Sequence, residues 1–207
     1  MLKTIMENVY AEIVQKKSKF IANIIYVQTV EEAEQRLKEI RKKYYDARHN
    51  CYAFSIMTQE GIINRSSDDG EPSGTAGGPI LNIINKNELT NVLVVVTRYF
   101  GGILLGTGGL VKAYSEATLK AIEQATFVVE QLGMEFEVVI SYADIEKFNY
   151  YCSKNDINVI KVEYDEQVKC IIEVNEEEKQ KLLLNIQNLN FKIYNYRVIK
   201  QKNIKKH

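Results

Sequence analysis

The sequence predicts an α+β protein made of two domains. Its 207 residues are enough for two small domains that each bury a hydrophobic core. Segments with the composition of strands alternate with amphipathic segments typical of helices, and two glycine-rich loops each lead into a helix. Near Gly133 the pattern of strands and helices starts again, so we place the domain boundary there.

The first domain is expected to combine a sheet with several helices. Its predicted strands are rich in β-branched and aromatic residues and lie at 9–14, 19–27, 51–57, 62–65 and 91–99. The last of these is apolar on both faces, which indicates a buried strand. Thr29 is placed to cap a helix that runs to about Tyr45, because acidic residues follow it and the basic trio at 41–43 lies near the helix end. This trio could form a nucleic-acid patch, but a solvated helix end is the simpler interpretation. Two more helices are expected, at 79–85, where Pro79 suits the first helical position, and at 110–125.

The second domain has the element order β-α-β-β-α-β. The predicted elements, in chain order, are a strand at 134–141, a helix at 143–153, strands at 157–164 and 168–174, a helix at 176–187 and a strand at 191–199. This order is that of the ferredoxin-like split βαβ sandwich. We therefore divide the chain into a first domain at 1–133, a second at 134–200 and a basic tail at 201–207, which is either a frayed end or a phosphate contact.

The charge balance argues against a general attraction to nucleic acid or membrane. The chain holds 27 basic and 27 acidic residues, so any polyanion site must be local. No apolar run approaches the length of a membrane span, and the N-terminus lacks the layout of a signal peptide. The 3 cysteines are odd in number and form no C-x-x-C pair, which suits a reducing compartment. We expect a cytoplasmic protein without a metal centre or cofactor.

The first glycine-rich loop, residues 68–79, is a candidate anion site. Glycine leaves the backbone N–H groups uncovered, and the loop leads into a helix N-terminus, where the dipole attracts negative charge. The simpler interpretation is a tight turn that needs glycine. The loop carboxylates could bind Mg²⁺ or could be solvated turn residues. The candidate contact residues here are Asp68, Asp69, Glu71, Ser73, Gly74, Thr75, Gly77 and Gly78, with Arg65 and His49 nearby.

The second glycine-rich loop follows the strand that ends at Tyr99. It fits neither the phosphate-binding G-x-x-x-x-G-K-[ST] pattern nor the dinucleotide-binding G-x-G-x-x-G pattern. What remains is a set of glycine amides at a helix start, with flanking cations and with aromatic rings that either stack on bases or belong to the core. The candidate contact residues are Arg98, Tyr99, Gly101, Gly102, Gly106, Gly108, Gly109 and Lys112.

His49 and Cys51 form the only pairing that suggests a nucleophile. A cysteine on an alternating strand more often faces the core as a small apolar residue. We therefore expect Cys51 to be buried and His49 to line the 68–79 loop.

These motifs together resemble the signature of the IMPACT/YigZ family. The resemblance rests on 68–79, on the Arg-Tyr-Phe-Gly-Gly run and the glycines that follow at 98–114, and on Ala47 to Ala53. It implies a first domain similar to domain 2 of ribosomal protein S5 and a ferredoxin-like second domain similar to one in elongation factor G. Eukaryotic relatives act in translational control, and nucleic-acid or ribosome binding is the usual inference for bacterial relatives. The resemblance brings no proven catalytic residue.

The sequence thus favours a non-catalytic protein that binds RNA, the ribosome or a translation-associated partner through both loops. Arg65, Arg98 and Lys112 would supply the counter-charges. An alternative is an enzyme acting on a small phosphorylated substrate, with Asp68, Asp69 or Glu71 as metal ligand or acid–base group. A further alternative is a scaffold for protein partners, in which the loops serve shape alone. We expect segments 68–79 and 98–112 to lie side by side.

Overall fold

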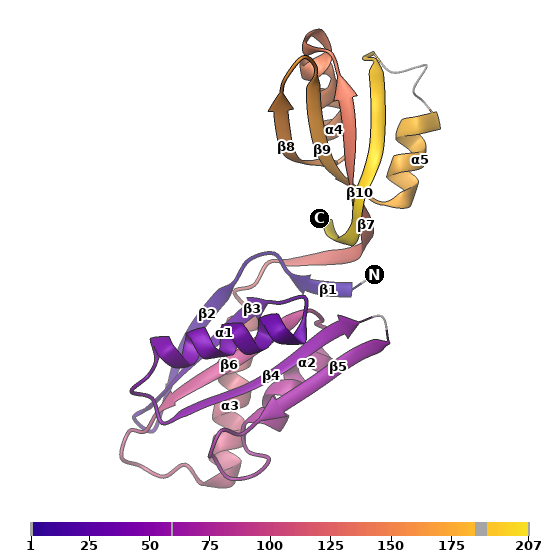
Figure 1. The fold of residues 1–207 in the computed structure, drawn as a ribbon. Coiled ribbons are helices and arrows are strands. Elements are labelled where there is room, and N and C mark those ends of the chain that lie inside the picture. The colour runs from indigo at the N-terminus through magenta and orange to yellow at the C-terminus, as the bar shows by residue number, and fades with distance from the viewer. Residues whose placement is uncertain (1, 59, 185–189, 207) are drawn as a thin grey trace. The chain divides into compact units, whose positions relative to one another are not determined.

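The computed structural model describes residues 2–58, 60–184 and 190–206 (Figure 1). The chain forms two compact units, residues 2–128 and the residues from Val129 onward. The division falls within β7 (Phe127–Ile140), slightly before the predicted boundary at residue 133. Each unit contains both a sheet and helices, so the α+β class is confirmed.

The first unit is built on an antiparallel sheet with the strand order β2-β3-β6-β4-β5. The strands are β2 (Val9–Gln15), β3 (Ser18–Tyr26), β4 (His49–Thr58), β5 (Gly61–Ser67) and β6 (Val92–Tyr99). All correspond to predicted segments, whereas β1 (Leu2–Ile5), which bridges to Leu89 through Lys3, was not predicted.

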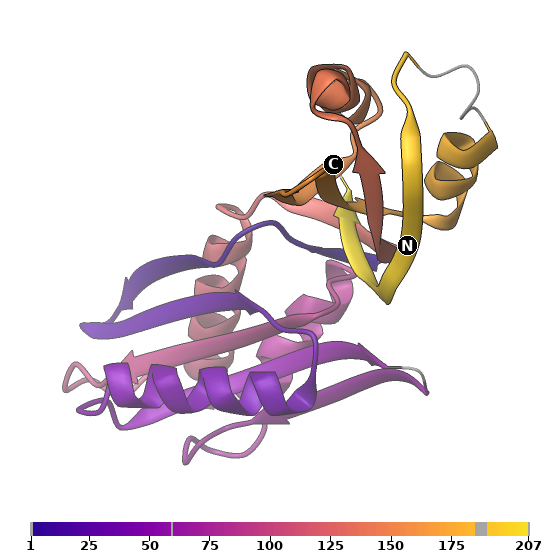
Figure 2. The same cartoon turned by 45° about the horizontal axis from the view of Figure 1, so that its top comes forward.

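Helices cover both faces of this sheet. The helix α1 (Val30–Lys43) lies on one face, and α2 (Gly77–Lys86) and α3 (Gly106–Ile122) lie on the other (Figure 2). The inner strands β3 and β6 are therefore buried on both sides, which explains their nearly continuous apolar sequence.

The helix α1 begins as predicted at Thr29. The Thr29 hydroxyl accepts a hydrogen bond from the Glu32 amide at 3.1 Å, and the Glu32 carboxylate accepts one from the Gln28 amide at 2.9 Å. These bonds satisfy donors that a helix start leaves without partners. Three apolar residues of α1, Ala33, Leu37 and Ile40, face the sheet and form a core with Phe54 and Val95 among others.

The helices of the opposite face start earlier than predicted. The helix α2 begins at Gly77, before Pro79, and α3 begins at Gly106, so the glycines 106–109 form its first turn. A second core lies beneath these helices, with Tyr114 fully buried against Phe20 at a ring distance of 5.1 Å. The second glycine-rich loop is therefore shorter than its glycine pattern suggested.

The second unit confirms the predicted β-α-β-β-α-β order. After β7 it contains α4 (Ile145–Lys154), β8 (Asn158–Tyr164), β9 (Val168–Val174), α5 (Glu176–Leu184) and β10 (Ile193–Lys206). The strand β7 pairs antiparallel with both β9 and β10, and β8 pairs with β9. One side chain in two on β7 and β9 points into a separate apolar core. The predicted end of the last helix, residue 187, lies outside the described residues.

The predicted basic tail belongs to a strand. β10 continues to Lys206 and pairs with β7 up to that residue, with register shifts between Ile193 and Asn195 and between Val198 and Lys200, while residue 207 lies outside the described part of the chain. Three basic side chains of β10 pair with acidic ones of the same sheet, namely Arg197 with Glu137, Lys200 with Glu135, and Lys202 with Glu135 and Glu173. These cations are therefore largely neutralised within their own unit.

Gly77 and Gly78 provide a direct test of the packing between α2 and β5. A Cβ atom at Gly77 would lie 2.7 Å from the backbone of Ser67, whereas one at Gly78 would meet nothing within 4 Å. We expect Gly77→Ala to lower the free energy of unfolding by about 1–3 kcal/mol. Gly78→Ala should change it by less than about 1 kcal/mol. Urea unfolding followed by tyrosine fluorescence measures both, and equal losses would contradict this packing.

Candidate functional site

Both glycine-rich loops lie at one end of the first sheet. The pairing of β3 with β6, and of β4 with both β5 and β6, brings the turn at Lys16–Lys17 together with residues 44–48, 68–76 and 100–105 (Figure 1). We call these four segments, with the first turn of α3, the loop end. The expectation that 68–79 and 98–112 are neighbours is confirmed by direct bonds from Glu71 to Arg98 and Tyr114.

The carboxylate of Asp68 occupies the backbone amides of the first loop. It accepts hydrogen bonds from the N–H groups of Gly74, Ala76 and Gly77 at 2.8, 2.9 and 2.8 Å. Burial of this carboxyl raises its pKa, but the three backbone donors outweigh burial and hold the pKa below its usual value. The expectation that these amides are open to an external anion was wrong, because the protein supplies its own anion at the start of α2.

Glu71 forms the centre of a buried polar cluster. Its Oε1 atom lies 2.7 Å from Nη1 of Arg98 and accepts the Tyr114 hydroxyl at 2.8 Å. The side chains of Glu71 and Arg98 are 4% and 7% exposed. The guanidinium of Arg98 also lies over the rings of Phe20 and Phe100, at 5.5 and 5.6 Å. Residues from the first loop, β6 and α3 are thereby joined inside the molecule.

The third carboxylate of the first loop, Asp69, also has partners within the protein. It pairs with Nη2 of Arg41 at 2.7 Å and accepts the Asn50 amide at 2.7 Å. The Asp69 carbonyl accepts a hydrogen bond from Nδ1 of His49 at 2.9 Å, so His49 lines this loop as expected. Asp69 and Glu71 thus tie the loop to the sheet, whereas Asp68 ties it to the start of α2. The described residues contain no cluster of His, Cys, Asp and Glu suited to a metal ion.

Cys51 is buried and lies in the same network. Its thiol donates to the Asp68 carbonyl at 2.9 Å and lies 3.3 Å from the Tyr114 hydroxyl oxygen. Burial raises the pKa of this thiol to about 12, so it stays protonated and unreactive. The pairing of His49 with Cys51 therefore has no reactive thiolate.

The remaining candidate residues divide between the interior and the surface. Thr75 is buried and donates to the Pro72 carbonyl at 2.6 Å, while Ser73 and Gly74 are exposed. Arg65 lies on β5 and pairs with Glu34 of α1 at 3.5 Å, so it does not serve the loops as a counter-charge. Tyr99 donates to Asp46 at 2.7 Å. The second loop and the first turn of α3 place Gly102, Gly106 and Gly108 at the surface, and Lys112 is exposed farther along α3.

Three exposed cations at this end, Lys16, Lys17 and Arg48, were not among the predicted contact residues, and Lys42, just before this end in α1, was assigned to a solvated helix end. Lys16, Lys17, Lys42 and Arg48 are exposed, and the described residues offer none of them an acidic partner within ion-pair distance. Two aromatic rings stand among them, Tyr45 at 85% and Phe100 at 50% exposure. The sequence did contain a signal for exposed charge here. Lys16 and Lys17 separate two predicted strands, and a two-residue hairpin turn must lie at the surface.

Comparison with known proteins identifies the family. The Impact N-terminal domain matches residues 16–122, and a domain of unknown function (DUF1949) matches residues 138–189. IMPACT family member YvyE of Bacillus subtilis is 35% identical over 175 residues, which cover 84% of this chain and 80% of the relative. This chain belongs to the IMPACT family. IMPACT family member YigZ of Escherichia coli is 35% identical over 150 residues, covering 72% of this chain and 74% of the relative.

A solved structure supports the same arrangement of elements. A crystal structure titled as that of a hypothetical protein is 29% identical, with a TM-score of 0.63, and the match covers 93% of this chain and 95% of that one. The matched Impact N-terminal domain includes the whole loop end, so its buried carboxylates and exposed cations both belong to the family domain. Within the described parts of this IMPACT-family chain, no helix is long and apolar enough to cross a membrane.

The hydrogen bonds to Asp68 predict a dependence of stability on pH. Asp68→Asn should lower the free energy of unfolding by about 1–3 kcal/mol at pH 7, because three amides lose a charged acceptor. The pKa of Asp68 is lowered in the folded state, so its contribution is present above the unfolded pKa and is lost as the pH falls through the folded pKa.

The difference between wild type and Asp68→Asn should therefore shrink as the pH falls below about 4, the unfolded pKa of Asp. Urea unfolding at several pH values measures it. Glu60→Gln, at an exposed carboxylate, is the control and should show neither effect. A constant difference from pH 7 to pH 2 would contradict the ionised cap.

The buried pair of Glu71 and Arg98 predicts strong coupling. Glu71→Gln leaves the Arg98 charge without a counter-charge and should cost about 3–5 kcal/mol of unfolding free energy. Arg98→Met should cost a similar amount. The double variant should lose clearly less than the two single losses together, because neither charge is then left alone. Strict additivity in urea unfolding would show that the two side chains do not depend on each other.

Proposed function

We propose that this protein is a non-catalytic binding protein of translation that contacts RNA through the loop end. The observation that carries the proposal is the surplus of free cations there. Arg41 and Arg98 use their charges in ion pairs. Lys16, Lys17 and Arg48 of the loop end, together with Lys42 near the end of α1 and Lys112 of α3, have no such partner among the described carboxylates, and the loop end also carries two exposed rings, Tyr45 and Phe100. Cations with exposed aromatic rings are the means by which proteins bind single-stranded nucleic acid.

The backbone at the hairpin tip supports a role for its two lysines. Lys16 and Lys17 have φ values of 44° and 66°, in the left-handed region that favours Asn and Gly. A side chain with a Cβ atom is strained there, at a cost of about 1–2 kcal/mol per residue. Lysine at both positions therefore lowers the stability of the turn while it places two positive charges at the hairpin tip, as expected where the charge has a function.

The start of α3 offers uncapped amides in the same place. Its N-cap residue, Leu105, makes no side-chain capping bond, and the first turn contains no acidic residue. Gly106 and Gly108 are exposed and leave room for a phosphate to approach the backbone, with Lys112 farther along the helix. Of the two loops predicted to bind an anion, only the second remains in this proposal. In the first loop, the backbone amides already donate to the Asp68 carboxylate.

The family supports a connection with translation, as the resemblance of the motifs implied. The alternative of an enzyme that acts on a small phosphorylated substrate has less support, because Asp68, Asp69 and Glu71 are all engaged by protein groups. The counter-charges also differ from those first expected. Lys112 remains in the proposed set, while Arg98 is buried and Arg65 pairs with Glu34.

The variant Lys16→Asn/Lys17→Gly separates charge from stability. It replaces both cations by residues that prefer the left-handed turn, so it should bind RNA more weakly while unfolding at the same or a higher temperature. Binding of a fluorescein-labelled 12-nucleotide oligouridylate is measured by fluorescence anisotropy as a function of salt. The slope of log K against log salt should become less steep by about 0.7 for each RNA phosphate that the variant no longer neutralises. Cosedimentation with purified ribosomes should weaken in parallel.

The control variant removes the same charge from the opposite end of the sheet. Lys86 and Lys120 lie in the last turns of α2 and α3, so Lys86→Gln/Lys120→Gln should leave the RNA affinity unchanged. Equal weakening by both double variants would mean that binding follows net charge alone. Wild-type protein without salt-dependent affinity for the oligouridylate or ribosomes would contradict the proposal and favour a protein partner.

A further inference from the structure

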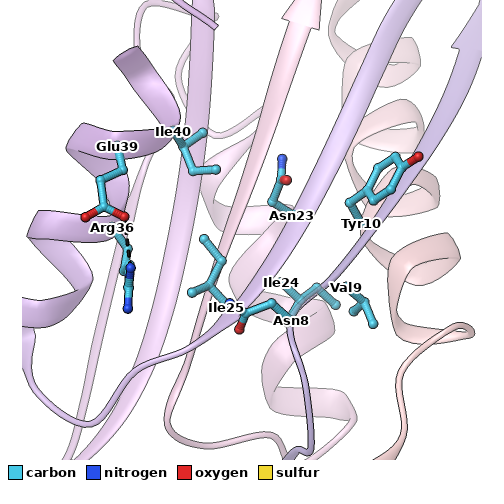
Figure 3. Close-up of a pocket in the computed structure, with 9 residues that line it drawn as sticks. All are labelled: Asn8, Val9, Tyr10, Asn23, Ile24, Ile25, Arg36, Glu39 and Ile40. Carbon is cyan, nitrogen blue, oxygen red and sulfur yellow. Dashed lines mark hydrogen bonds and ion pairs between the residues drawn. The ribbon is translucent and has the colours of Figure 1, made fainter. Parts of the chain in front are cut away.

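A groove on the α1 face of the first unit contains a buried polar group without a partner among the described residues. The groove lies between α1 and the β2–β3 hairpin and has a volume of about 290 Å³ (Figure 3). It is lined by the start of β2 and the end of β3, the opposite half of the hairpin from Lys16 and Lys17. It is therefore separate from the loop end, and the inference drawn from it does not rest on the proposed RNA contact.

Asn23 stands in the middle of this groove. It interrupts the apolar row that Ile21 and Ile25 form on the same face of β3, and it lies opposite Tyr10 on one side and Val95 on the other. The residue is only 7% exposed, and its Nδ2 atom has no hydrogen-bond partner in the described part of the chain. An unpaired buried amide destabilises a protein, so packing alone would favour an apolar residue at this position.

The walls of the groove are neutral and partly apolar. Arg36 and Glu39 of α1 pair with each other at 3.0 Å, so neither charge is left to attract an ion (Figure 3). In the hairpin beside the groove, Lys19 of β3 pairs with Glu12 of β2 at 2.7 Å. Ile25 and Ile40 supply the apolar part of the lining. An occupant must therefore be uncharged and must bring both an apolar part and a hydrogen-bonding group.

We infer that this groove binds a segment of a partner polypeptide that inserts a carboxamide side chain, that of Gln or Asn. A carboxamide offers an acceptor and a donor side by side, which matches the amide of Asn23. Rotation about the last side-chain torsion of Asn23 brings either amide atom toward the groove. A side chain reaches the depth of Asn23 more readily than a peptide backbone does. RNA fits this groove poorly, because the residues described in its walls hold no free cation.

Two matched peptides test the inference on the full chain. The probes are acetyl-Ala-Gln-Ala-amide and acetyl-Ala-Met-Ala-amide, which are uncharged and similar in size, with uridine as a third ligand. Each is titrated to about 10 mM, the weak range expected for so few contacts. The signals of the Asn23 side-chain NH₂ group are followed by two-dimensional NMR. We expect saturable shifts of these signals with the Gln peptide, at least ten-fold weaker binding of the Met peptide and no shift with uridine.

Asn23→Leu provides the second arm. Leu has nearly the same shape and no polar atom, so the variant should unfold at a higher temperature than wild type. It should also lose the shifts that the Gln peptide causes in the Ile25 and Ile40 methyl signals. Equal binding of both peptides, a preference for uridine, or no shift with the Gln peptide would each overturn the inference, whatever the effect on stability. A lower unfolding temperature of Asn23→Leu would also overturn it, because Asn23 would then be a structural residue.

Discussion

The ion pair between Glu71 and Arg98 determines where both glycine-rich segments lie. Glu71 belongs to the loop after β5, Arg98 to β6, and the Tyr114 hydroxyl from α3 shares the same Glu71 oxygen. Because both charges are buried, separating them would leave each one unpaired in the interior, which is strongly unfavourable. The loop is therefore held against the sheet and against α3, and Arg98 in turn supports the ring of Phe100.

This internal use of acidic residues explains how an electrically balanced chain acquires a basic surface. Asp68 caps α2, Asp69 pairs with Arg41, and Glu71 is buried. Their charges are used by backbone and side-chain groups inside the loop end, so the lysines at the hairpin tip remain without counter-charges among the described residues. In the second unit the opposite holds, because the cations of β10 face acidic residues of the same sheet. A local field thus arises without a net charge on the chain.

Sequence reasoning succeeded where a periodic pattern was enough and failed where tertiary partners decide. Alternating and β-branched runs located β2 to β6, and the capping signal at Thr29 located α1. The short strand β1 has no pattern of its own. Arg65 and Arg98 could not be distinguished by residue type, because their roles depend on which carboxylate lies beside them after folding. The same holds for Asp68, whose three amide donors come from residues six to nine positions later.

Hydrogen exchange of the full chain, measured with and without oligouridylate, is the most direct test. It shows whether Asp68 occupies the amides of the first loop while the hairpin tip and the start of α3 bind RNA. We expect the amides of Gly74, Ala76 and Gly77 to be protected already in the free protein and their exchange not to change on binding. RNA should slow exchange in the hairpin around Lys16 and in the first turn of α3. Free exchange at Gly74, Ala76 and Gly77, followed by strong protection when RNA binds, would show that these amides receive the phosphate and would contradict the account.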